Sequence, residues 1–339
     1  MKAFTNQLLK WYGSNRVLYP WRKTKRPYPV WLSEILLQQT RIPVALNFYE
    51  KILHRYPDLK ALSEANDSEF LSLWSGIGYY RRAHNMLACA REVMQKHRGT
   101  FPRDLSSLLD LPGIGKYTAG ALLNICFNRL TPAIDGNIRR VLSRLLMSNS
   151  NLESSFTTAG KGAPAADFFQ SLMELGERIC LPVPLCSNCP VARYCKACEA
   201  GLQKEFPRRT NTKRTQIFHW YLLVLKSNGS AYYLLNPSRP FLKAAWIFPD
   251  LLVSEKLSSA RLKQQFHKKW GIQLKDVREK SVIGHAVTFR KIFAHVLVSD
   301  SFQLNEPDGK WMRQIELERH PTSSITAKIH NSLLQKQKV

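Results

Sequence analysis

The sequence lacks any long hydrophobic run. Its longest apolar stretches are short, and the one at residues 217–225 is interrupted by His219. A helix that crosses a membrane needs about 20 apolar residues in succession, so the sequence excludes a membrane-spanning helix. The beginning of the chain shows neither the apolar core of a secretory signal nor an Arg-rich transit segment. We therefore expect a bacterial-type cytoplasmic protein without a membrane partner.

Acidic residues are also scarce. The 339 residues include 25 Asp and Glu against 50 Lys and Arg, which gives a formal net charge of +25. Such a charge attracts polyanions and raises the rate at which they meet the protein. An anionic membrane would also attract it, but the basic residues are scattered along the chain instead of concentrated on one amphipathic helix. Nucleic acid is therefore the favoured partner.

The number of cysteines is odd, so they cannot all be paired in disulfides within the chain. Five of the seven cysteines fall within residues 180–198, and a reducing compartment favours metal ligation. Cys180, Cys186, Cys189 and Cys195 have five, two and five residues between them, which favours one [4Fe-4S] cluster. A rival set replaces Cys180 with Cys198 and has the CxxC ends of a zinc site, although its central gap is shorter than in common zinc modules.

The hydrophobic pattern of the sequence changes near residue 203. Apolar residues recur with the helical period up to about residue 200 and predict a mostly α region at 1–202. Residues 203–215 contain few apolar and five basic residues, which predicts a solvated linker. Residues 216–339 predict a smaller α+β domain with a hairpin turn at 228–229, a helix at 258–270, strands at 281–289 and 291–299, and a helix near 324–335. The length of the chain agrees with two domains.

A tight turn at residues 111–117, LPGIGKY, precedes a helical pattern. Gly113 and Gly115 let the backbone turn sharply and leave unpaired amides at the start of the helix, where Lys116 follows. Such amides bind a phosphate oxygen of DNA. The same turn also suits an ordinary connection between two helices, so the motif alone leaves both interpretations open.

Two carboxylates lie in unlike surroundings. Glu34 shares a helical pattern with apolar neighbours that would raise its pKa and keep it protonated. Asp135 directly precedes a helical pattern, where it would be the N-cap and would stay ionised. Cleavage of an N-glycosidic bond needs an acid for the departing base and an anion near the sugar. A solvated helix glutamate and a purely structural N-cap remain the alternatives.

Taken together, WLSE at 31–34, LPGIGKY at 111–117, IDGN at 134–137 and the cysteine run resemble the adenine DNA glycosylases of the MutY family. The resemblance implies helix-hairpin-helix (HhH) glycosylase domains with an iron-sulfur loop at 1–202, followed by a Nudix-like α+β domain at 216–339. It implies that Glu34 protonates adenine N7 and that Asp135 stabilises or captures the sugar. Asn137 matches the family's neighbouring active-site Asn, and Tyr117 matches a tyrosine placed beside the sugar. The family's first cysteine gap is one residue longer than the gap here.

The residue at position 117 also distinguishes a monofunctional glycosylase from one with lyase activity. The related endonuclease III family carries Lys at this position and uses its amine to form a Schiff base that leads to strand cleavage. Here Lys116 stands one residue earlier and is expected to point elsewhere, so a monofunctional glycosylase is predicted. An endonuclease III-like pyrimidine-lesion glycosylase with lyase activity is one alternative. A non-catalytic DNA-binding regulator with a metal cluster is another.

An adenine inside a duplex must be flipped out before it can react. Gln38 and Gln39 supply polar side chains that can fill the gap, and Arg81 and Arg82 suit phosphates. Tyr79 matches the intercalating tyrosine of the family, although by composition a tyrosine pair after glycine is more often core packing. The predicted partner is double-stranded DNA with an A·8-oxoguanine or A·G mispair, bound by a monomer.

The second domain resembles a Nudix domain without its Mg²⁺-binding helix, because Glu255 stands nearly alone before a run of lysines. We therefore expect this domain to recognise 8-oxoguanine and not to hydrolyse pyrophosphate. The family's Phe-Ser-His motif aligns best with Phe293, Ala294 and His295, and this implies a DNA contact for His295. Ala294 supplies no hydroxyl, which leaves the discrimination of 8-oxoguanine from guanine open. A half-buried strand position is the alternative for His295.

Overall fold

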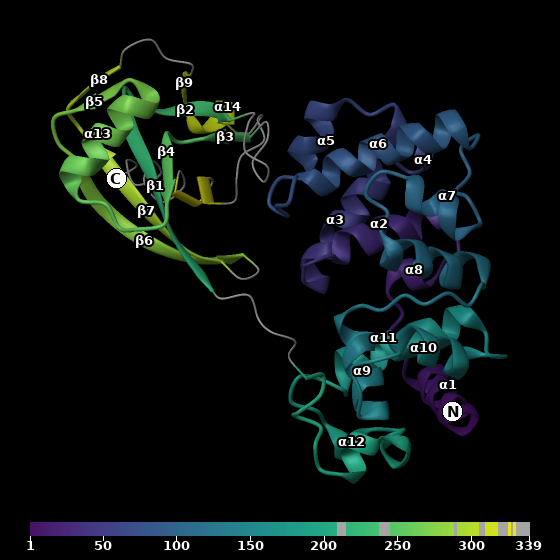
Figure 1. The fold of residues 1–339 in the computed structure, drawn as a ribbon. Helices are drawn as coiled ribbons and strands as arrows, with labels where there is room; N and C mark the ends of the chain where they lie inside the picture. Colours follow the sequence, from purple (N-terminus) through teal and green to yellow (C-terminus); the bar gives the residue numbers. More distant parts are fainter. Residues whose placement is uncertain are drawn as a thin grey trace. The chain divides into compact units, whose positions relative to one another are not determined.

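The computed structural model describes residues 1–208, 215–236, 245–287, 290–304 and 309–317, with 325, 326, 328 and 329. By its internal contacts the chain divides into two compact units (Figure 1). The first unit comprises Met1–Ala65 and Asn85–Thr210, and the second comprises Asn66–His84 and Asn211–Val339. The domain limits expected from the sequence stay a prediction, and residues 66–84 are the segment that they assign differently.

Helices make up the regular structure of the first 200 residues, as the periodicity predicts. The α-helices are α1 (Lys2–Asn15), α2 (Pro27–Leu37), α3 (Ile42–Arg55), α4 (Leu59–Ser63), α5 (Asp67–Leu73), α6 (Arg81–Lys96), α7 (Leu105–Asp110), α8 (Lys116–Phe127), α9 (Gly136–Leu146), α10 (Leu152–Gly160), α11 (Ala165–Arg178) and α12 (Lys196–Glu199). Three short 3-10 helices are η1 (Pro20–Arg22), η2 (Cys186–Asn188) and η3 (Ala192–Tyr194).

Helices α2, α8, α9 and α11 form the centre of the first unit, where α8 packs on α2 and α11 packs on both α8 and α9. Local signals set the limits of two of them. Asp135 caps α9, and Asn128 ends α8 in the left-handed conformation while its Oδ1 accepts from Ala165 N at 2.8 Å. Gly176 lets α11 approach α9, because a Cβ there would lie 2.8 Å from Asn137 Cβ.

The second unit contains a twisted mixed sheet. Its strands are β1 (Gln216–Ser227), β2 (Ser230–Asn236), β3 (Ala245–Ile247), β4 (Asp250–Val253), β6 (Arg278–Val287), β7 (Arg290–Ser299) and β9 (Gly309–Met312). The order is β3-β2-β1-β7-β6, with β4 paired to β1 and β9 paired to β2. Strands β1 and β7 run parallel, whereas β6 and β7 are antiparallel. A separate pair joins β5 (Ile272–Leu274) to β8 (Phe302–Leu304).

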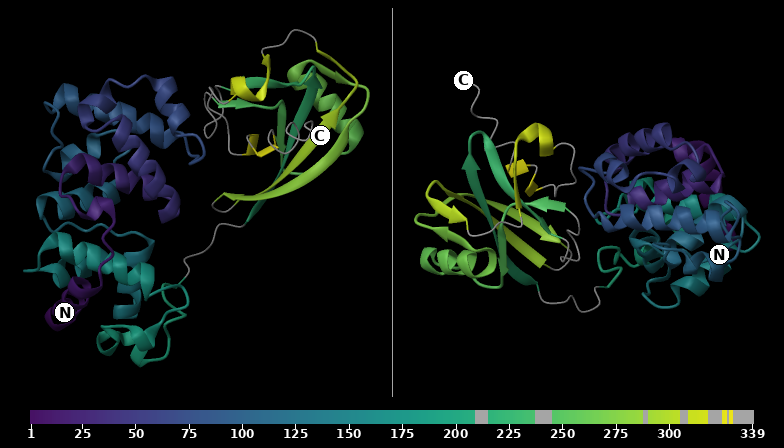
Figure 2. Two further views of the ribbon diagram at one scale, coloured as in Figure 1. Left: turned by 180° about the vertical axis from the view of Figure 1, so that it is seen from behind. Right: turned by 90° about the horizontal axis from the view of Figure 1, so that it is seen from above.

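Two apolar clusters cover the two faces of the sheet because successive strand residues point to opposite sides. Leu222 and Val224 of β1 belong to one cluster, and Tyr221 and Leu223 belong to the other. Helix α13 (Ser259–Trp270) adds Leu262 and Phe266 to the second cluster, and Figure 2 shows this helix beside the sheet from two further sides. The face of β1 with odd numbers is therefore the face that α13 covers.

Several local predictions for the second unit are confirmed. The 228–229 turn joins β1 to β2, and α13 ends at Gly271, whose φ of 63° is left-handed. The strands expected at 281–289 and 291–299 correspond to β6 and β7. The helix expected near 324–335 lies largely outside the described residues, and the short helix α14 (Gln314–Leu317) precedes it. Within the described part of the chain, every helix is too short or too polar to cross a bilayer.

Candidate active site

A pocket of about 790 Å³ lies within the first unit. Its walls come from η1, α2 with the turn that follows it, the start of α8, the start of α9, and α11. The pocket brings together sequence-predicted residues from three separate motifs: Glu34, Gln38, Gln39, Gly115, Lys116, Tyr117, Asp135 and Asn137. Side chains that are about 100 residues apart in the chain therefore border one cavity.

Glu34 is held by the apolar side of α2. Trp31 and Ile35 are buried on either side of it in the helix, as the sequence predicts, while Glu34 itself is partly exposed to the pocket. Burial, and next the charge of Asp135, act together to raise the pKa of Glu34 to about 7. A hydrogen bond from Tyr117 and the charge of Arg22 act in the opposite direction. Near neutral pH a large fraction of Glu34 is thus a protonated acid.

Asp135 is the N-cap of α9. Its Oδ1 accepts a hydrogen bond from Ile138 N at 2.7 Å, which satisfies one of the free amides at the start of the helix. The positive end of the helix dipole also stabilises a carboxylate at this place. Because Asp135 borders the pocket as well, the N-cap role and a role in the pocket are compatible.

Tyr117 connects the two carboxylates to the hairpin motif. Its hydroxyl donates to Glu34 and lies 3.9 Å from Met173 Sδ, and its ring packs against Phe169 with centroids 6.3 Å apart. Burial and the charges of Glu34 and Asp135 hold the pKa of Tyr117 well above its usual value. The phenol is therefore a fixed neutral donor to Glu34.

The hairpin turn has the predicted geometry. Gly113 has a φ of 77°, and a Cβ there would lie 2.7 Å from Asn85 Cβ, so glycine is required for both reasons. Gly115 is the exposed N-cap of α8. Lys116 is exposed and also borders the pocket, contrary to the expectation that it would point elsewhere.

Gln38 and Gln39 differ in their surroundings. Gln38 Nε2 lies 3.5 Å from Thr118 Oγ1, at the limit of a hydrogen bond, and connects the end of α2 to α8. Gln39 is exposed and has a φ of 58°, a left-handed conformation that few residues with side chains adopt. Its side chain thus projects from a sharp turn at the pocket rim.

Tyr79, Arg81 and Arg82 belong to the second unit and are not part of the pocket lining. Tyr79 is 47% exposed with a φ of 51°, so it projects from the turn and does not fill the core, which was the alternative. Arg82 lies over the rings of Trp74 and Tyr79, each 5.5 Å from its guanidinium carbon, and burial lowers its pKa to about 10. Arg81 is exposed.

The five clustered cysteines are all partly buried and unpaired. Burial, together with the neighbouring cysteines, raises the pKa of the Cys186 and Cys189 thiols to about 11. Each member of the predicted set Cys180, Cys186, Cys189 and Cys195 lies within electrostatic reach of the other three, and Cys198 approaches Cys186 and Cys195. Among the described residues, however, no three such side chains are arranged as a finished metal site.

Arg140 links the start of α9 to the first cysteine. Its Nη2 donates to Asn137 Oδ1 at 2.7 Å and to Gly176 O at 2.8 Å, and its Nε donates to Cys180 O at 2.6 Å. Asn137 is therefore oriented by a cation that also holds the cysteine loop.

Arg144 is buried one turn further along α9. It donates to Cys180 Sγ at 3.3 Å, to Leu181 O at 2.6 Å, to Pro182 O at 2.9 Å and to Phe206 O at 3.0 Å. These bonds fix the loop with its shortened first gap, and they place a positive charge beside the Cys180 sulfur, where a thiolate ligand would be stabilised.

His295 is not placed for the predicted DNA contact. It is 3% exposed in β7, its Nδ1 bonds Glu279 Oε2 at 2.6 Å, and its Nε2 bonds His219 Nδ1 at 2.9 Å. We call Glu279, His295 and His219 the histidine network. Since both ring nitrogens have protein partners, the strand interpretation fits its position and the contact with a base does not.

Sequence reasoning missed two walls of the pocket. Tyr19, Trp21 and Arg22 come from the η1 segment, and Gln170, Met173 and Glu177 come from one side of α11. The spacing of the α11 residues by three and four positions is a signal that was available, because such residues share one helix face. Nothing in the sequence alone shows that this face borders Glu34.

Comparisons with known proteins identify the family of this chain. Residues 32–160 match the HhH-GPD superfamily of base excision DNA repair proteins. An adenine DNA glycosylase of Buchnera aphidicola (Acyrthosiphon pisum) is 32% identical over 75% of this chain and 75% of its own length. The adenine DNA glycosylase of Rattus norvegicus is 38% identical over 58% of this chain and 42% of its own.

Among solved structures, a thermostable thymine-DNA glycosylase is 30% identical with a TM-score of 0.55, over 59% of this chain and 96% of its own. A non-covalent endonuclease III–DNA complex, 20% identical with a TM-score of 0.50 over 59% of this chain and 95% of its own, shares the fold. The resemblance found from the motifs is therefore confirmed by relatives that match along most of the chain. This chain belongs to the adenine DNA glycosylases of the HhH-GPD superfamily, which act in base excision repair.

Proposed function

We propose that this glycosylase hydrolyses the N-glycosidic bond of an adenine opposite 8-oxoguanine or guanine, after the adenine has been flipped into the pocket of the first unit. One observation carries the proposal: Glu34 and Asp135 border the same cavity, and their surroundings favour opposite protonation states. Protonated Glu34 donates to the departing base, and ionised Asp135 stabilises the positive charge that develops on the sugar.

The neighbouring side chains hold these two groups in place. The Tyr117 hydroxyl donates to Glu34 and so restricts the direction of its carboxyl group. Asn137, oriented by Arg140, presents its amide beside Asp135 at the start of α9. The pocket volume of about 790 Å³ is large enough for a nucleoside and an attacking water. Water then adds to the sugar from the side of Asp135.

The cysteine loop fits one [4Fe-4S] cluster held by Cys180, Cys186, Cys189 and Cys195. The cation of Arg144 at Cys180 Sγ supports a ligand set that includes Cys180. The proximity of the thiols suits either set, because Cys198 is hydrogen-bonded to Cys186. When bound, the cluster supplies a cross-link that fixes the loop. Arg140 and Arg144 connect that loop to α9, so its order supports the position of Asn137.

We further propose that residues 216–339 recognise the lesion opposite the adenine. A mixed sheet with one long helix across it is consistent with a Nudix-like domain. Helix α13, SARLKQQFHKKW, contains no acidic residue, so it offers no carboxylates for Mg²⁺ and does not support pyrophosphate hydrolysis. We propose that the protein binds double-stranded DNA as a monomer, with 1–202 as the catalytic region and 203–215 as the linker.

Incubation with an A·8-oxoguanine duplex and with an A·G duplex tests the proposed function. Free adenine and strand breaks are measured, the breaks with and without alkali. We expect adenine release from both duplexes and breaks only after alkali, and we expect Asp135→Asn to lower the single-turnover rate about 10²–10³-fold. Breaks without alkali would indicate a lyase, and since Lys116 also borders the pocket, borohydride trapping with Lys116→Ala identifies the amine.

A further inference from the structure

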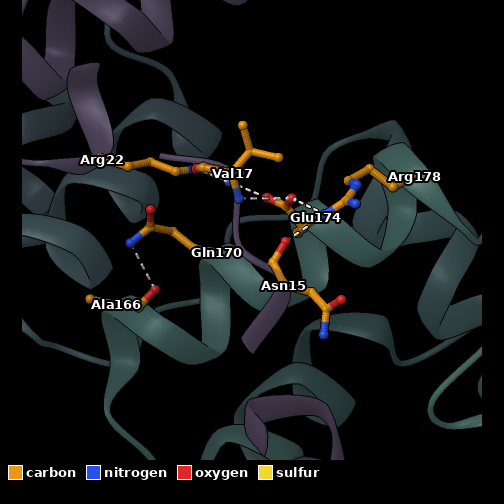
Figure 3. Close-up of polar contacts among 7 residues, drawn as sticks. All are labelled: Asn15, Val17, Arg22, Ala166, Gln170, Glu174 and Arg178. Carbon is orange, nitrogen blue, oxygen red and sulfur yellow. Dashed lines mark hydrogen bonds and ion pairs between the residues drawn. The ribbon is translucent and has the colours of Figure 1, made fainter. Parts of the chain in front are cut away.

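Glu174 of α11 is a buried carboxylate that takes no part in the chemistry described above. Its side chain is 1% exposed, whereas the side chains of Arg22 and Arg178, its two cationic partners, are 10% and 42% exposed. Figure 3 shows Glu174 between these partners, and the third donor is the backbone N of Val17. A charge that is buried so completely is costly unless it is paired and hydrogen-bonded, and removal of one partner is strongly destabilising.

The contacts of Glu174 hold the η1 segment against α11. Oε1 accepts from Val17 N at 3.3 Å and from Arg178 Nη1 at 2.9 Å, and Oε2 bonds Arg22 Nη1. Arg22 Nη1 also donates to Val17 O at 3.1 Å, and Arg178 Nη1 donates to Asn15 O at 2.6 Å. One carboxylate thus ties Val17, which follows α1, and Arg22, the last residue of η1, to the helix that forms a pocket wall.

Arg22 faces the pocket in which Glu34 lies. Its guanidinium carbon lies 5.2 Å from the centre of the Tyr19 ring, and Tyr19 stacks on Trp21 with centroids 5.1 Å apart. All three residues border the pocket. The positive charge of Arg22 opposes the protonation of Glu34, since it stabilises the carboxylate. Because Glu174 pairs with Arg22, it offsets part of that positive charge at the pocket wall.

We propose that Glu174 is a positioning residue for the adenine glycosylase reaction: it anchors and neutralises Arg22 at the pocket wall, so that Glu34 stays protonated. This inference rests on the proposed role of Glu34. The charged and titratable groups around these two carboxylates are Arg22 and Tyr19 of the η1 segment, Tyr12 of α1, Arg41, Lys116, Tyr117 and Cys126 of α8, Asp135 before α9, and Glu177 and Arg178 of α11.

Single-turnover adenine release from A·8-oxoguanine duplex, measured from pH 5 to pH 9, tests the proposal. We expect Glu174→Gln to lower the pH at which the rate falls to half on the alkaline side by at least about 0.5 unit, because a less neutralised Arg22 favours ionised Glu34. Arg178→Gln is the matched control. Arg178 is the more exposed partner of Glu174 and does not border the pocket, so its loss should leave the pH of half-maximal rate unchanged.

Arg22→Gln and the double variant complete the test. Removal of the cation should move the alkaline limb to higher pH, and Glu174→Gln should add nothing to the limb in the Arg22→Gln background. Titration of the Glu34 carboxyl by ¹³C NMR in the free protein gives the same shifts without turnover, and if Glu174→Gln does not fold, the shift in Arg22→Gln carries the test. The proposal would be overturned if Glu174→Gln lost the same fraction of the rate at every pH and left the pKa of Glu34 unchanged. No adenine release by the wild type would instead overturn the proposed function.

Discussion

The pocket of the first unit and the histidine network of the second unit differ in how far the predicted polar residues are exposed and hydrogen-bonded. In the pocket, Glu34 accepts a hydrogen bond from Tyr117 and Asp135 accepts one from Ile138 N, and both carboxylates still face an open cavity. In the network, His295 is buried and both of its ring nitrogens have protein partners. We infer from this comparison that polar residues with incomplete hydrogen bonds, directed into open space, are the better candidates for ligand binding.

The largest effect is expected for Glu34→Gln. Gln keeps the shape and the hydrogen bond to Tyr117 but cannot donate an acidic proton, and general acid catalysis contributes about 10²–10⁴-fold. We expect the single-turnover rate of adenine release to fall at least about 10³-fold while duplex binding is retained. Glu153→Gln on α10 is the control, because Glu153 is exposed and outside the pocket. A rate within a factor of three of wild type would remove Glu34 from the reaction.

Replacement of single cysteines distinguishes the two ligand sets. Iron content and the visible absorbance of protein purified without oxygen should drop strongly in Cys180→Ser and stay near wild type in Cys198→Ser. The reason is that Cys180 approaches all three other predicted ligands and is bonded by Arg144. The reverse pattern, or zinc in place of iron, would favour the set with Cys198.

The raised pKa of Glu34 also predicts a pH-dependent stability difference. Its folded pKa of about 7 exceeds the ordinary value of 4.5, so ionisation favours the unfolded state as the pH rises through this interval. Glu34→Gln does not ionise and should therefore gain stability over wild type between pH 4.5 and 7, by up to about 3 kcal/mol. Denaturant unfolding at pH 5 and pH 8 measures this gain. An equal difference at both pH values would contradict the buried acid.

The smallest effect is expected at His295. Its loss removes two hydrogen bonds, to the exposed Glu279 and to the half-buried His219, so His295→Gln should destabilise the second unit by about 1–3 kcal/mol. The ratio of adenine release from A·8-oxoguanine and A·G duplexes should stay near the wild-type ratio. His267→Gln, at an exposed position of α13, controls for the loss of a histidine. A changed ratio with unchanged stability would restore the predicted DNA contact.

Local chemistry explains which features could be predicted from the sequence. The burial around Glu34 follows from its helical neighbours Trp31 and Ile35, and the N-cap role of Asp135 follows from the residues after it. The place of His295 depends on its pairing with β1, where His219 lies 76 positions earlier. No local pattern reports such a register.

The residues that form two walls of the pocket could not be predicted from local sequence patterns either. Arg22 and the polar side of α11 reach the cavity only because α11 packs against α1 and α8. Glu174 looks in the sequence like an ordinary helix glutamate, and only its burial between two arginines marks it. Long-range packing, and not residue type, decides these roles.

The pH dependence of single-turnover adenine release by the wild-type protein tests the central claim most directly. If protonated Glu34 is the acid of the reaction, the rate should fall about tenfold for each pH unit above about pH 7, in step with the titration of its carboxyl. A rate that stays constant up to pH 9, with Glu34 shown by NMR to be ionised, would contradict the account.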